Sequence, residues 1–328
     1  MKINLYDKNL NRIAYIGDKY KSLLWSEGFN TMGSFTIELS ENDDIKKKIK
    51  TDYYVGRSDR KTLMVIKSVQ ASNGLIIATG KPATRVLDDV AFVGTISEGK
   101  QIDTEISNAY NSSAKFPNVV FLPTNIPKRY QHQISHKSFL ELCETMCQDA
   151  DMGFKAVKDG KTIGIEFYDP AENPNLVFSR KFGNLSLDSV LTSTEPYKNY
   201  AIVLGSGEGN ARVRVDVDKT NGEQRRELIV DASGIQPEDG ETTEQYRSRL
   251  AAEGSNRLLE TQDIFECSIS TDPSDFGIKY DLGDIITVYL TDYGMKMKAR
   301  LAKFTQTVQN NETKTTLEIG KIVYVKKR

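Results

Sequence analysis

The chain has 328 residues, a length that predicts two to three domains of roughly 100–200 residues each. Lys and Arg number 44 and Asp and Glu number 45, so the net charge of −1 argues against a chain-wide cationic surface for nucleic acid or anionic lipid. Hydrophobic residues make up 38%, against roughly 45–50% in ordinary soluble domains by a slightly different count. The cores are therefore expected to be thin, as in β-barrels, sandwiches and proteins that complete their burial by oligomerising.

Signals for export and membrane insertion are missing from the sequence. Residues 1–8 lack the apolar stretch of a signal peptide, and no segment approaches the ~20 apolar residues that cross a bilayer. Three cysteines are not a disulfide framework. We expect a chain that is made in a cytoplasm and kept reduced there, with no stable membrane insertion.

Residues 1–92 predict a series of short strands separated by turns. Phe35, Ile37 and Leu39 alternate with polar residues, and Asn73-Gly74 is typical of a hairpin turn. The charged run at 43–50 is interpreted as a solvated loop or a single helical turn. The expected strands are 2–5, 12–16, 34–39, 63–69 and 75–79. This pattern predicts an N-terminal β-barrel or sandwich.

Residues 93–183 predict an inserted α/β domain. Ile102, Ile106 and Tyr110 lie on one face of an expected short helix. A second helix is expected with Ser135 as its N-cap and Gly153 as its end. The buried stripe of that helix is expected to be Phe139, Leu142, Cys143, Met146 and Ala150. Strands are expected at 163–167 and 176–179.

Residues 184–262 predict a linking domain of strands followed by a helix. The expected strands are 200–204, 211–217 and 228–230. Thr242-x-x-Gln245 is a capping box that opens a helix running to about Glu260. The inward positions of this helix are expected to be Tyr246, Leu250 and Leu258.

Residues 263–322 return to strands and predict a C-terminal β-barrel, followed by a basic tail at 323–328. The expected strands are 265–270, 285–290, 296–307 and 315–319. The segment Arg300–Lys321, with Asn310-Asn311 at its turn, echoes Met64–Lys81, because each is strand, turn and strand ending in Gly-Lys. Two copies of one β module would produce this echo, and so would chance.

Glycines at 205, 207 and 209 follow an expected strand, as in loops that cradle phosphate. A phosphate loop leads into a helix whose N-terminal amides hold the anion. Here Val213, Val215 and Val217 alternate in the next segment, which is therefore a strand. The glycine stretch is interpreted as a hairpin turn.

Both histidines and two of the three cysteines lie close together, as His132-x3-His136 and Cys143-x3-Cys147. Imidazole and thiolate are zinc ligands, but the cysteine face of this helix also carries apolar residues, and cysteine is commonly buried. We favour core packing over a metal site. No catalytic, cofactor-binding or metal-binding residue is assigned.

The sequence contains no HExxH and no Gly-x-Ser-x-Gly motif. Cys267 lies on an alternating segment without a neighbouring histidine, so a Cys–His pair would require contacts made by distant folding. Trp25, the single tryptophan, is interpreted as a core anchor, with sugar stacking as the alternative.

A set of segments follows one another in a characteristic order along nearly the whole chain. The segments are Tyr20–Glu27, Gly33–Leu39, Val55–Arg57, Met64–Ile66, Asn199–Gly205, Gly207–Gly209 with Arg212, Leu228–Ala232 and Tyr280–Val288. In this order they resemble the hub or tail-associated proteins at the baseplate and tail tip of long-tailed phages and phage-derived, bacteriocin-like particles.

The resemblance implies an α+β, mainly β, multidomain chain with two small similar β-barrels and intervening α/β domains. It implies a homotrimer in which three chains present six barrels to a hexameric tail tube. Implied partners are the tail tube protein, the distal tail protein, and spike, receptor-binding fibre or lysin components. No cofactor and no sequence-specific nucleic-acid recognition are expected.

The resemblance predicts a structural virion protein of the tail tip, assembled in the bacterial cytoplasm, and not an enzyme. A tail-associated peptidoglycan hydrolase is the alternative, and a carbohydrate-binding β module is a further one. The sequence does not identify the residues of the subunit and tube interfaces.

Overall fold

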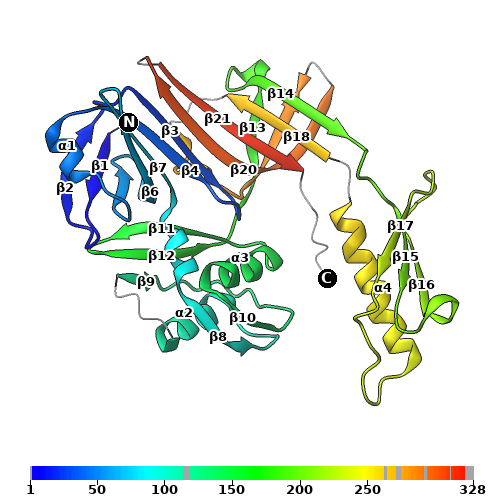
Figure 1. The fold of residues 1–328 in the computed structure, drawn as a ribbon. Coiled ribbons are helices and arrows are strands. Elements are labelled where there is room, and N and C mark those ends of the chain that lie inside the picture. Colours follow the sequence, from blue (N-terminus) through cyan, green and yellow to red (C-terminus); the bar gives the residue numbers. More distant parts are fainter. Residues whose placement is uncertain are drawn as a thin grey trace. The chain divides into compact units, whose positions relative to one another are not determined.

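The computed structural model describes residues 2–113, 118–261, 264–270, 275–291, 294–310 and 312–321. The chain divides into two compact units. The large unit comprises Met1–Asp188 and Ser268–Gly320, and the small unit comprises Ser189–Cys267 and Lys321–Arg328. Strands outnumber helices in both units, and they form several sheets (Figure 1). The prediction of a mainly β chain with some helices is confirmed.

The N-terminal segment carries seven strands and one short helix. They are β1 (Ile3–Tyr6), β2 (Arg12–Gly17), β3 (Ser22–Gly28), β4 (Ser34–Ser40), α1 (Asp43–Lys48), β5 (Tyr54–Arg57), β6 (Leu63–Ser72) and β7 (Leu75–Pro82). Phe35, Ile37 and Leu39 are buried as their alternation predicts, and they pack with Trp25, which is fully buried. Of the two forms expected for the charged run, a solvated loop or a single helical turn, the structure shows the helical one, α1.

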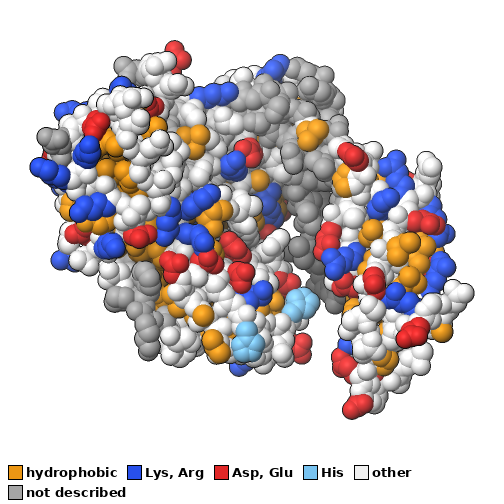
Figure 2. Space-filling model, viewed as in Figure 1, with side chains coloured by type: hydrophobic (Ala, Val, Ile, Leu, Met, Phe, Trp, Pro, Cys, Tyr) orange, Lys and Arg blue, Asp and Glu red, His pale blue; other side chains and the backbone are white. Residues whose placement is uncertain are grey.

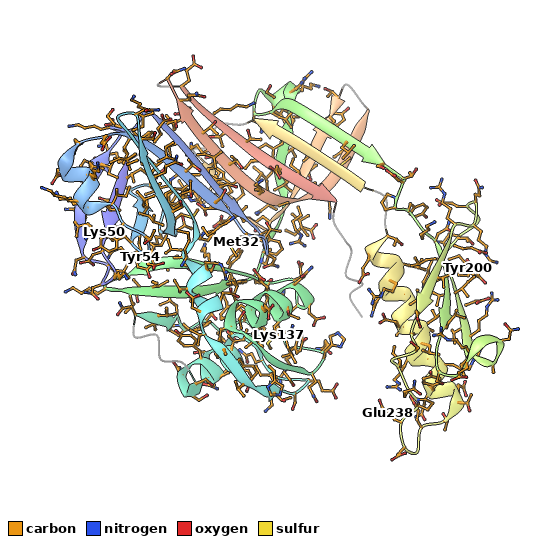
Figure 3. The ribbon with its side chains drawn as sticks, viewed as in Figure 1. Met32, Lys50, Tyr54, Lys137, Tyr200 and Glu238 are labelled. Carbon is orange, nitrogen blue, oxygen red and sulfur yellow. The ribbon has the colours of Figure 1, made fainter. Side chains whose placement is uncertain are left out.

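The α/β insert follows. Its elements are η1 (Ala83–Asp89), β8 (Ala91–Ile96), α2 (Ile102–Ser113), β9 (Val119–Phe121), β10 (Ile134–Ser138), α3 (Phe139–Asp149), β11 (Gly153–Asp159) and β12 (Thr162–Tyr168). Strands β11, β12 and β9 form one sheet, and β10 pairs with β8. The buried faces of α2 and α3 share one hydrophobic core with these strands. Tyr54 on β5 also belongs to this core (Figure 3).

Two predicted boundaries of α3 are wrong. Ser135 lies in β10, where its hydroxyl is 2.8 Å from that of Thr95. The N-cap is Ser138, whose Oγ accepts a hydrogen bond from the Glu141 backbone N–H at 3.2 Å. The helix ends at Asp149, before Gly153, because the chain turns through a left-handed residue, Asp151.

The remaining strands of the large unit complete its sheet. The elements after β12 are β13 (Glu172–Ser179), η2 (Arg180–Phe182), β14 (Ser186–Ser193), β18 (Ile264–Ser270), β19 (Ile285–Leu290), β20 (Met295–Gln309) and β21 (Glu312–Lys321). Strands β14 and β18 each cross the boundary between the two units.

The small unit is a three-stranded sheet covered on one face by a helix. Its elements are β15 (Tyr200–Leu204), η3 (Gly209–Ala211), β16 (Arg214–Asp218), β17 (Glu227–Asp231) and α4 (Thr243–Glu260). The predicted capping box of Thr242 and Gln245 is present at the start of α4, and the inward positions Tyr246, Leu250 and Leu258 are buried. Neither α4 nor any other described helix is long and apolar enough to span a membrane.

The side of this small sheet that does not face α4 carries exposed apolar side chains. Ile229 is 70% exposed, and Figure 2 shows hydrophobic side chains gathered over the strands. Tyr200 at the start of β15 is labelled in Figure 3. Its hydroxyl donates a hydrogen bond to Asp216 on β16 at 3.0 Å.

The strand order of the large sheet repeats itself. At the N-terminal end the neighbours run β1-β5-β6-β7-β4-β3, and at the C-terminal end they run β13-β19-β20-β21-β18-β14. We rank the six strands of each set by their order along the chain and leave β2 out. Both sets then show the same order in space, which is first, fourth, fifth, sixth, third and second. One pairing differs, since β1 is antiparallel to β5 and β13 is parallel to β19. Among the described strands these pairings form an open path, and neither set closes on itself.

Candidate functional site

The N-terminal and C-terminal strand sets are joined by one strand pair. Strand β20 is antiparallel to β3 from Lys303–Gly28 to Gln309–Ser22, while the first half of β20 pairs with β19. The hydroxyl oxygens of Thr305 and Ser26 lie 3.3 Å apart across this pair. We call this region the module junction. It fixes two parts of the chain that are far apart in sequence against each other.

A buried carboxylate organises the module junction. Glu27 on β3 is 7% exposed. Its Oε1 accepts hydrogen bonds from the Trp25 indole N–H at 2.6 Å and from the Thr62 hydroxyl at 3.0 Å. The Arg60 Nε lies 3.4 Å from the same oxygen. These partners compensate the cost of taking the carboxylate out of water.

Aromatic rings and arginines from both strand sets stack beside this carboxylate. The Phe276 and Phe304 rings are stacked, with centroids 4.2 Å apart, and the Arg60 guanidinium lies 4.2 Å from the Phe276 centroid. The Arg57 guanidinium lies 5.6 Å from the Trp25 ring. Such contacts combine cation–π attraction with apolar burial.

A charged cleft of about 730 Å³ opens at the module junction. Most of its charged groups are paired: Arg57 donates to both carboxylate oxygens of Asp59, at 3.0 and 2.6 Å, and Lys155 lies 3.2 Å from Asp281. Burial raises the pKa of the Asp59 carboxyl, but the hydrogen bonds and charge of Arg57 outweigh it, so the net pKa lies below its usual value. This arrangement holds two strand sets together.

The cysteines that were weighed as metal ligands are core residues. Cys143 and Cys147 are fully buried in the core shared by α2 and α3, and burial raises the pKa of both thiols well above the ordinary value. The interpretation of these cysteines as core residues is confirmed. Among the described residues no group of three or more His, Cys, Asp and Glu side chains is placed to hold a metal ion.

The two histidines lie at the surface, where Figure 2 shows them apart from each other. His132 Nε2 lies 3.3 Å from Asp149, and His136 is a left-handed residue of β10. Cys267 is in β18, and its side chain lies outside the described residues. The structure therefore brings the cysteine pair and the histidines to different environments.

The glycine stretch at 205–209 is a turn, as predicted. It joins β15 to the antiparallel β16, and Gly207 and Gly209 have φ values of +109° and +52°, which favour glycine. The stretch runs into η3, a 3-10 helix of three residues, and then into the strand β16, so no α-helix begins at this turn to hold a phosphate at its N-terminus.

Sequence reasoning found Trp25 as a core anchor but missed its partners at the module junction. The missed residues are Glu27, Arg57, Arg60, Phe276 and Phe304. The available signal was the charged run from Arg57 to Arg60 directly after a buried strand, because charged side chains there need partners. Those partners come from the other end of the chain, which the pattern does not reveal.

Comparisons with known proteins agree with the fold. A model of the siphovirus ReqiPepy6 Gp37-like protein family matches residues 100–321. Comparison with curated proteins gives no match. The chain is similar in structure to prophage tail protein gp18 from Listeria monocytogenes, with a TM-score of 0.60 and 11% identity over 99% of this chain and 95% of that chain.

Two further solved structures share the fold. The 43 kDa tail protein of prophage MuSo2 from Shewanella oneidensis gives a TM-score of 0.63 with 11% identity, over 97% of this chain and 98% of that chain. A chain of the Francisella PdpA–VgrG complex gives 0.53 with 9% identity, over 99% of this chain and 58% of that chain. The fold is therefore that of phage tail proteins, as the resemblance predicts. Because the family model covers more than half of the sequence, the chain belongs to the siphovirus ReqiPepy6 Gp37-like protein family.

Proposed function

We propose that this chain is a structural hub of a phage or phage-derived tail tip. Three copies form a ring that joins the hexameric tail tube to a spike, a receptor-binding fibre or a lysin. The observation that carries the proposal is the repeated strand order at the two ends of the chain. Membership of the family and the prophage tail fold support the same assignment.

The two repeated strand sets would act as the two barrel-like domains of the hub. In this proposal the first β domain is residues 1–92, and the second combines β13 and β14 with residues 263–322. The α/β insert and the linking domain account for the rest of residues 93–262. The module junction sets the angle between the two β domains of one chain, because β3 and β20 share a ladder and a buried cluster.

Symmetry adaptation is the physical work of such a hub. A hexameric tube ends in six equivalent faces, and a chain with one β domain would need six copies to match them. Three chains with two similar domains provide six faces while leaving three sites for a threefold partner. Contacts of this kind are heterologous and close into a ring when the rotation per domain is one sixth of a turn.

The proposed partners are the tail tube protein and the distal tail protein on one side, and spike, fibre or lysin components on the other. The location is the virion tail tip, reached after assembly in the bacterial cytoplasm. No turnover of a substrate is required for this role, and we propose that the chain is not an enzyme.

The test is the mass of the full chain in solution, alone and with tail tube protein, by sedimentation velocity. The proposal expects a species of three times the chain mass of 36.8 kDa. A strict monomer under both conditions would overturn it. Release of fragments from purified peptidoglycan by the chain would instead support the hydrolase alternative.

A further inference from the structure

Strands β6 and β20 occupy the same place in the two repeated sets, next to β5 and β19 respectively. Their edges are paired differently. Each forms a hairpin-like pair with the next strand, through Asn73 and Asn310, which have φ values of 54° and 51°. On one edge of β20, the first half pairs with β19 and the second half pairs with β3. Beyond β5, which ends its pairing at Val65, the second half of β6 has no neighbour on that edge among the described strands.

Solvent exposure follows this difference. Counting back from the turn asparagines, residues 67–72 of β6 match residues 304–309 of β20. In β6 five of these six residues are exposed and Val69 is half-buried. In β20 only Gln309 is exposed, and Phe304 and Gln306 are buried. Residues 67–72 are therefore an unpaired copy of an edge that is paired inside the chain; we call them the open edge.

The amide and carbonyl groups of alternate residues in the open edge point away from β7. Ser72 and Leu75 face each other across the two-residue turn, so their amide and carbonyl groups bond to each other. Antiparallel pairs alternate along a ladder, so the groups of Ala71 and Val69 point outward. They offer two donors and two acceptors in the spacing of a strand.

The complementary element is also present at the other end of the chain. Strand β3 pairs with β20 inside the chain, and the strand in the same place of the second set is β14. Among the described strands β14 pairs only with β18. The β3–β20 pair is therefore formed once inside the chain. The two strands that would form an equivalent pair, β14 and the open edge of β6, do not pair with each other in a single chain.

We propose that β14 of one chain pairs with the open edge of β6 in the next chain, repeating the β3–β20 joint between subunits. The inference rests on the proposed function, since it names the contact through which the three-chain ring closes. Main-chain hydrogen bonds supply the attraction in strand addition of this kind. The occupant of the open edge is a second copy of this chain.

The side chains of the open edge fit a surface that is exposed before assembly. Lys67 forms an exposed ion pair with Asp52 at 3.0 Å, and Ser68, Gln70 and Ser72 are polar. A lysine on an edge strand discourages indiscriminate pairing with other chains.

Hydrogen–deuterium exchange of the full chain tests the proposal. In the assembled form, the outward amides of Val69 and Ala71 should exchange at least about tenfold more slowly than in the free chain, because pairing protects them. Peptides covering 304–309 are the internal control and should be protected in both states. A trimer whose residues 67–72 exchange at the free rate would overturn this joint while leaving the hub proposal intact. A chain that never assembles would overturn both.

A matched pair of variants gives a second readout. Ala71→Pro removes an outward amide and blocks an incoming strand, yet leaves the ladder to β7 intact. Ala71→Ser keeps the amide. Sedimentation should show loss of the trimer for Ala71→Pro only, with unchanged circular dichroism for both. Trimers of equal stability in both variants would contradict the proposed pairing.

Discussion

The buried Glu27 carboxylate makes the sharpest prediction about the module junction. Replacement by alanine removes the acceptor of the Trp25 indole N–H and the Thr62 hydroxyl, and it removes the nearest anion to Arg60. Arg60 keeps only the more distant Asp281, at 3.6 Å. Breaking a buried ion pair from one side costs about 3–5 kcal/mol. We expect Glu27→Ala to lower the free energy of unfolding of the large unit by this amount.

Trp25 reports this unfolding directly, because it is the single tryptophan and is fully buried at the junction. Its fluorescence, followed in urea, gives the midpoint and slope from which the free energy is extrapolated. The small unit contains no tryptophan and does not contribute. Glu27→Gln keeps an acceptor and should lose less than Glu27→Ala.

The matched control is Glu318→Ala on β21, which removes an exposed pair with Lys303 at 3.0 Å. Exposed pairs contribute at most about 1 kcal/mol. If Glu27→Ala cost no more than Glu318→Ala, the carboxylate would not hold the junction, and the account of this cluster would be refuted.

Three further predictions concern the rest of the fold. Burial raises the pKa of the Asp103 carboxyl, but hydrogen bonds from Thr124 and its neighbours outweigh it and the net pKa is lowered. The free energy of unfolding should therefore be higher for the unmodified chain than for the Asp103→Asn variant at pH 7, and this difference should shrink as the pH falls below about 4. A pH-independent difference in urea midpoints would contradict this. In a Cys267→Ser background, the two buried thiols in α3 should not react with a thiol reagent until the chain unfolds, and rapid labelling of the folded chain would show the core assignment to be wrong. Gly254→Ala in α4 should lower the melting temperature despite the better helix propensity of alanine, because a Cβ would lie 2.5 Å from a methyl of Val203; an unchanged or higher melting temperature would contradict the close packing.

Local patterns were sufficient for most elements of this chain. The alternation around Ile37 gave a strand with the correct buried face, and the Thr242 capping box gave the start of α4. Both signals are contained within a few residues. The error at Ser135 shows where local patterns fail. Two serines, Ser135 and Ser138, precede α3, and the pairing of β10 with β8, about forty residues away in sequence, decides which of them is the N-cap.

The strand order and the module junction were beyond the reach of such patterns. The echo of two strand-turn-strand segments indicated a repeat, yet only the pairing of all six strands in each set shows its extent. The contacts of Trp25 with its surroundings depend on β20, almost the whole chain away. Long-range pairs of this kind depend on the complete fold and leave no periodic trace in the sequence.

The central claim is that a repeated β module lets three chains match a six-membered tube. An electron cryomicroscopy map of the tail tip in the parent particle tests it most directly. We predict three copies of the chain around the axis, with the N-terminal and C-terminal strand sets alternating as six similar faces toward the last tube ring. A single copy, six copies, or a ring in which only one strand set meets the tube would contradict it.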